Sequence, residues 1–166
     1  MALKFTNSQE FLNKLQLFIN VFIAIPMLAF IVLFLRIENK TYTPDFLDEA
    51  LIFSLRFIIF IGVAGLVALG VVFFNRERNK LDASMTIRDK LEIYYSASVV
   101  RSYYFLVATI ISLIGLALTA EQFYIIYYTI CLVAFSTTYP TIYRINRQLR
   151  LNREEREVII SRKEIK

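Results

Sequence analysis

Four long apolar runs constrain this chain more than any other feature of its sequence. Each run has about 20 residues, and a helix of that length, rising about 1.5 Å per residue, crosses a hydrocarbon core of about 30 Å. Open strands would leave unpaired backbone groups in lipid, and the runs lack the alternation of barrel strands. The sequence therefore predicts an all-α integral membrane protein, a bundle of four transmembrane helices near 15–35, 50–74, 102–120 and 123–143.

The domain organisation follows from the room that these runs leave. The chain has 166 residues, of which 57% are hydrophobic, so little remains for a soluble domain with its own core. We expect one four-span membrane domain at 1–143, interrupted by a loop at 75–101, and a basic tail at 144–166.

Positive charge is distributed unevenly between the connections. The loop at 75–101 holds six Lys and Arg residues and the tail at 144–166 holds eight, whereas the connection 37–49 holds only Lys40. Cytoplasmic connections carry the excess of Lys and Arg. With no transit-type segment, this asymmetry predicts a multi-pass protein of the plasma (inner) membrane with both termini and the loop 75–101 in the cytoplasm.

The cytoplasmic pieces are predicted to be helical. Thr86 and Asp89 form a capping-box pattern that leads into the third span. In the tail, three arginines recur at every third residue: Arg144, Arg147 and Arg150. We expect the fourth span to continue out of the membrane as a basic helix. Its arginines would contact anionic lipid headgroups or dock a cytoplasmic partner, and the pattern leaves both open.

Arg56 is the one charged residue inside the second run. Helical side chains lean toward their own N-terminus, so its guanidinium points to the outer headgroups and can snorkel there. An ion pair with Glu49, seven residues earlier, or with Glu121, in the third connection, is a second interpretation. An anion contact or a pore-lining role is a third, since charges within membranes are often functional.

Small residues cluster in the second and third runs, where they allow helices to approach closely. They include Gly62, Ala64, Gly65, Ala68 and Gly70 in the second run, and Ala108, Ser112 and Gly115 in the third. We expect these two spans to pack together, or the second to meet a partner helix. A pore lined by small residues is the alternative.

Catalytic chemistry has few candidates here. The chain has no histidine and a single cysteine, Cys131, which excludes His-based metal sites, thiolate clusters and Ser–His catalysis. No acidic residue lies deep in a run, and no phosphate-binding glycine motif is present. We predict no enzyme activity, no cofactor, no metal site and no nucleic-acid partner, since the net charge of +5 comes from residues beside the spans.

The function expected from these features is that of a non-catalytic tetraspan subunit. It would anchor, scaffold or assemble a larger inner-membrane complex, with the bilayer and other membrane subunits, or copies of itself, as partners. The alternative is a small homo-oligomeric channel or transporter, which would need Arg56, Asn20 or the polar segment 136–141 to face water. An immunity or toxin-like role is neither favoured nor excluded by these residues.

Overall fold

The computed structural model describes residues 8–44, 47–82, 84–149 and 151–160, and within these ranges its regular structure is entirely helical. Three helices are long and three are short. Their bounds are α1 Ser8–Glu38, α2 Glu49–Arg78, α3 Ile87–Thr119, α4 Phe123–Thr138, α5 Ile142–Gln148 and α6 Arg153–Ile160.

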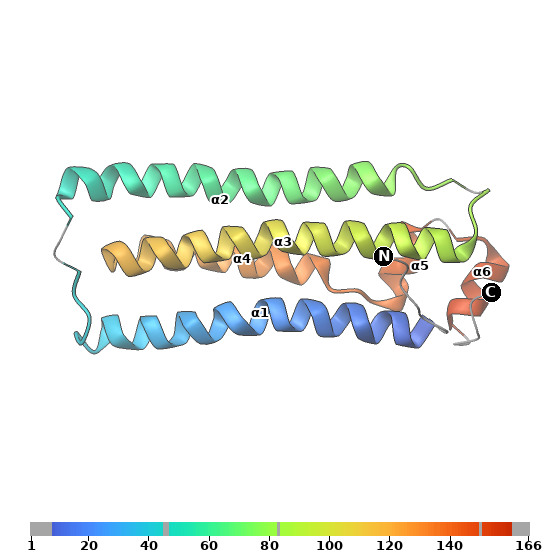
Figure 1. The fold of residues 1–166 in the computed structure, drawn as a ribbon, viewed down its shortest axis with the longest axis horizontal. Coiled ribbons are helices and arrows are strands. Elements are labelled where there is room, and N and C mark those ends of the chain that lie inside the picture. Colours follow the sequence, from blue (N-terminus) through green and yellow to red (C-terminus); the bar gives the residue numbers. More distant parts are fainter. Residues whose placement is uncertain (1–7, 45–46, 83, 150, 161–166) are drawn as a thin grey trace.

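Helix α3 is the centre of the bundle. It packs against α2 most extensively, and also against α4 and α1 (Figure 1). The three long helices lie side by side, and α5 and α6 gather at one end together with the start of α1 (Figure 1). We call this end the cap.

The helices meet the length and composition that a membrane requires. Three helices, α1 to α3, qualify alone, and α4 with α5 qualifies as a fourth, bent pair. Exposed large apolar side chains lie on these helices between Leu17 and Leu35, Leu51 and Val72, and Tyr103 and Tyr143. In the described stretch 87–102, by contrast, no large apolar side chain is exposed. The fold is therefore an all-helical bundle with an apolar outer band, as expected of a multi-pass membrane protein.

The predicted continuous fourth helix is wrong. Helix α4 ends at Thr138, and α5 leaves it at an angle of 77°. Pro140 has no backbone N–H to donate to the helix, and it restricts the preceding residue. Tyr139 accordingly adopts an extended ψ of 118°, so the helix cannot continue. The Nη1 atom of Arg144 instead donates to carbonyl oxygens in the last turn of α4, at 3.1 Å to that of Ser136 and 2.9 Å to that of Thr137. The arginine thus caps the helix that the proline ends.

The predicted capping box at the start of α3 is confirmed. The side chain of Thr86 accepts a hydrogen bond from the amide of Asp89 at 3.2 Å. The helix that follows has 33 residues, about 50 Å at 1.5 Å per residue, which exceeds a hydrocarbon core of about 30 Å. Its first half therefore belongs to the cap and its second half to the apolar band.

Two separate cores hold the molecule together. The bundle core joins α2, α3 and α4 and is made of Ile59, Val63, Ala108, Leu116, Tyr124, Tyr127 and Cys131. The cap core joins the start of α1, the end of α2, the first half of α3, α5 and α6. Its buried residues are Phe11, Leu12, Leu15, Ile19, Phe74, Leu91, Tyr94, Ala97, Ile145, Leu149, Leu151 and Ile159.

Candidate functional site

Arg56 forms an ion pair with Glu121. Its Nε donates to Oε2 at 3.1 Å and its Nη2 donates to Oε1, which makes the pair bidentate. The guanidinium carbon also lies 4.1 Å from the centre of the Phe123 ring. Both side chains keep about a quarter of their surface exposed. The arginine is therefore held by a carboxylate and an aromatic face at the end of the bundle opposite the cap.

Of the three interpretations of Arg56, the ion pair is the arrangement present, and Glu121 is the partner. Glu49 is exposed at the first turn of α2, and no hydrogen bond or ion pair joins it to Arg56. The pair closes α2 onto the connection between α3 and α4. In this contact the positive charge of Arg56 is paired with the negative charge of Glu121.

The small residues of α3 lie at contacts between helices. Ala108, Ser112 and Gly115 are buried. A Cβ built on Gly115 would overlap the ring of Tyr124 and approach Ile59 Cδ1 at 3.0 Å. At this position only glycine lets α3, α4 and α2 come together.

Helices α2 and α3 pack together as expected, but most of the small residues of α2 face away from α3. Ala64 and Ala68 are exposed, and a Cβ on Gly62 or Gly65 would meet no atom within 4 Å. The buried residues of α2 recur at a different set of helical positions: Ile59, Val63, Gly70 and Phe74. Contact of α2 with a partner helix stays a prediction.

Among the small residues of the second run, Gly70 is the one that packs closely against α3. A Cβ there would lie 2.9 Å from Phe105 Cε1 and 3.1 Å from Tyr104 Cβ. Gly70 lies seven residues, or two helical turns, after the buried Val63, and this spacing puts both residues on the same face of α2.

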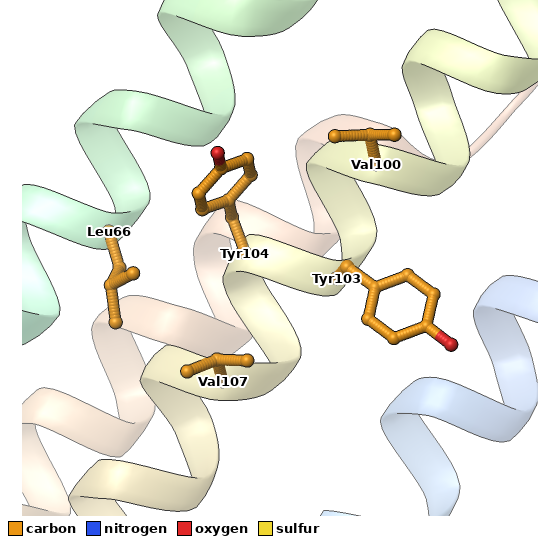
Figure 2. A pocket seen from close by; sticks show the side chains of 5 residues that line it. All are labelled: Leu66, Val100, Tyr103, Tyr104 and Val107. Atoms are coloured by element: carbon orange, nitrogen blue, oxygen red, sulfur yellow. The ribbon is translucent and has the colours of Figure 1, made fainter.

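An apolar pocket of about 350 Å³ lies between α2 and α3. Leu66 of α2 and Val100, Tyr104 and Val107 of α3 line it, and Tyr104 extends toward α2 (Figure 2). Tyr103, the fifth lining residue, turns toward α1 (Figure 2), where its ring contacts Phe22. The described residues that line the pocket all carry apolar or aromatic side chains.

The cap contains charged side chains that are unusually well buried. Lys90 is 1% exposed, and its Nζ donates to both oxygens of Glu155 at 2.8 and 3.1 Å, which ties α3 to α6. Arg101 is 6% exposed and has no acid partner among the described residues; its guanidinium lies 3.7 Å from the centre of the Phe74 ring. Neither residue stood out in the sequence, because burial in the cap depends on where α5 and α6 fold back.

The three arginines predicted to contact headgroups or a partner have different positions. Arg144 is half-buried and caps α4, as described above. Arg147 is exposed and lines a cavity between α5 and α6. Arg150 lies outside the described residues.

The predicted site residues that the structure brings together contact other residues of this chain. No group of three or more metal-ligating side chains occurs within the part of the chain that the structure describes. The single cysteine, Cys131, is buried in the bundle core.

Comparisons with protein-family models, with curated proteins and with solved structures find no match to this chain.

Proposed function

We propose that this protein is a non-catalytic tetraspan subunit that anchors and scaffolds a larger complex in the plasma (inner) membrane, with the cap and both termini in the cytoplasm. Its partners would be the bilayer and other membrane subunits. The distribution of Lys and Arg between the connections supports this orientation.

The observation that carries the proposal is the cap, which fixes segments from all parts of the chain into one body. Ser8 Oγ donates to the carbonyl of Ile159 at 3.0 Å, and Gln16 Nε2 donates to the carbonyl of Pro140 at 3.1 Å. The buried pair of Lys90 and Glu155 adds a third link. A rigid basic platform at the end of a membrane bundle is the form that a scaffolding subunit needs.

The interior of the bundle favours a scaffold over a channel within one chain. Phe105 and Phe135 are fully buried and pack edge to face, with ring centres 5.7 Å apart. Tyr124 is likewise fully buried, against Gly115. Large aromatic side chains fill the space between the helices where a water path would have to run.

The outward face of α2 is the surface that we propose for a partner helix. Ala64, Gly65 and Ala68 lie on it, and small residues let two helix backbones approach closely in lipid. A bulky residue at Gly65 would keep a partner helix away without disturbing the bundle, because nothing lies within 4 Å of its position.

The test is purification from native membranes in mild detergent. We expect a partner at fixed stoichiometry, and we expect Gly65→Leu to remove it while leaving the fold intact. Ala29→Leu, at an exposed position on α1, is the matched control and should retain the partner. A chain that purifies only with itself and conducts ions in liposomes would overturn the proposal and establish the channel.

The orientation is tested separately with single cysteines in a Cys131→Ser background. Asn39→Cys and Asn79→Cys place thiols at exposed positions in the first and second connections. An impermeant maleimide should label intact cells only at residue 39. Labelling at residue 79 alone would reverse the orientation.

A further inference from the structure

A small polar cavity lies between α5 and α6 in the cap. Its volume is about 340 Å³, and it is lined by Tyr143, Asn146 and Arg147 of α5 and by Arg156 of α6. Ligand cavities begin at roughly 300 Å³. The space therefore suits a group the size of a lipid headgroup.

Among the described residues, the cavity is lined by two positively charged side chains and no negatively charged one. No side-chain hydrogen bond or ion pair joins Arg147 or Arg156 to another described residue, and no carboxylate is among the described residues that line the space. Glu155, the neighbour of Arg156, is engaged by Lys90 and by the amide of Asn152 at 2.8 Å. Two guanidinium groups facing one cavity repel each other, and a phosphate, which accepts their paired N–H groups, relieves that repulsion.

Asn146 adds a second requirement. Its Oδ1 is fully buried and accepts no hydrogen bond. A buried acceptor without a donor destabilises the protein. A ligand that carries a hydroxyl group beside its phosphate would supply that donor.

The depth of the cavity favours a membrane lipid as the source of the phosphate. The exposed apolar side chains of α4 continue to Tyr143, which is 73% exposed at the start of α5. Tyr143 also lines the cavity, so the last of the exposed apolar side chains lies at the edge of this space. Tyrosine is enriched at this boundary between hydrocarbon and water.

Two further arginines, Arg101 and Arg144, lie in the cap but do not line the cavity. Arg144 is on α5, one turn before Arg147, and it is close enough to Arg101 for their charges to repel. The Nε of Arg101 is fully buried without a hydrogen-bond partner. The cap therefore gathers four arginines around one end of the bundle.

We propose that this cavity binds the phosphate of an anionic phospholipid headgroup from the leaflet on the cap side. Arg147 and Arg156 donate to the phosphate oxygens, and Asn146 accepts from a headgroup hydroxyl. The proposal does not depend on whether the protein is a subunit of a complex.

The test is a calorimetric titration of the full chain, in neutral detergent, with short-chain phosphatidylglycerol. We expect binding that Arg147→Gln and Arg156→Gln each weaken by about tenfold or more, the size of a lost charge-assisted hydrogen bond. Arg76→Gln is the matched control, because it removes one exposed charge from the cap end of α2 without touching the cavity. Circular dichroism of each variant establishes that the helices remain.

Three probes separate the sources and the contacts. Inorganic phosphate and glycerol phosphate should bind far more weakly than the lipid; equal binding would overturn the lipid assignment. Phosphatidylmethanol has the same charge but no hydroxyl, so Asn146→Ala should remove the preference for phosphatidylglycerol over it. An equal loss in Arg76→Gln, or no binding of phosphatidylglycerol, would refute the site.

Discussion

The bundle core and the cap core are built on opposite surface chemistry. Around the bundle core the outward residues are large and apolar, such as Ile61 and Leu69 on α2. Around the cap core the large apolar residues are inside and charged residues form much of the surface, as in a water-soluble protein. One helix, α3, takes part in both, with Leu91 in the cap core and Leu116 in the bundle core.

The cap core and the bundle core are stabilised by different forces. The cap excludes water from its apolar side chains, so the hydrophobic effect stabilises it. In lipid that force is absent between helices, and close packing has to replace it. In the bundle, Gly115 against Tyr124 and the edge-to-face pair of Phe105 and Phe135 are contacts of this kind, in which shape decides stability.

The largest expected effect is on the cap. Glu155→Gln leaves Lys90 charged and buried, which costs about 3–5 kcal/mol when a buried pair loses one partner. Hydrogen exchange of α6 should accelerate strongly, because this pair joins α6 to α3. Lys90→Met combined with Glu155→Gln removes the unpaired charge and should restore most of the protection.

A surface pair provides the control for this change. Glu92→Gln breaks the exposed contact with Arg88, 3.7 Å long, and should cost less than about 1 kcal/mol. If both glutamine variants lose the same protection, the buried pair does not hold the cap.

Two leucines on α1 compare the cap core with the exposed apolar band. Leu15 is fully buried in the cap core, and Leu15→Ala should lower the free energy of unfolding by about 2–5 kcal/mol. Leu17 is 66% exposed in the apolar band, so Leu17→Ala should change it by less than about 0.5 kcal/mol. Thermal unfolding in detergent, followed by circular dichroism, measures both. Equal losses would mean that the end of the band near the cap has been placed incorrectly.

The sequence predicts where the apolar helices lie, because hydrophobic length is a local property, but α1, α2 and α3 have 31, 30 and 33 residues and extend beyond the predicted spans. Pro140 indicates a helix break, since proline cannot continue a helix. The arginine repeat at 144, 147 and 150 instead indicated a continuous helix, and that prediction was wrong. The angle of 77° depends on how Arg144 reaches back to Ser136 and Thr137, a contact that periodicity does not contain.

The candidate site was harder to predict for the same reason. Glu121 was one of two acids within reach of Arg56, and only the turn between α3 and α4 decides between them. The small residues of α2 and α3 formed similar patterns, yet those of α3 are buried and most of those on α2 are exposed. Which face of a membrane helix turns inward cannot be deduced from an apolar run, because both faces are apolar.

Two glycines test close packing in the bundle. Gly115→Ala forces a methyl group against Tyr124 and should cost about 1–3 kcal/mol through overpacking. Gly65→Ala meets open space and should be neutral or stabilising by up to about 1 kcal/mol, as expected for alanine in a helix. Melting temperatures of the two variants in the same detergent give the comparison. A loss at Gly65 as large as that at Gly115 would show that both faces of α2 are packed.

The smallest expected effect is at the far end of the bundle, where Arg56 and Glu121 remain partly exposed. Arg56→Leu and Glu121→Gln should each lower the melting temperature by roughly 2–4 °C, and the double variant should lose little more, because each single change already breaks the pair. Arg56→Lys should behave like a partial loss, since an ammonium group cannot reproduce the bidentate contact. Glu49→Gln is the control and should be additive with Arg56→Leu. If instead Glu49 couples to Arg56 and Glu121 does not, the arginine leans toward the start of its own helix, and the connection between α3 and α4 is held by packing alone.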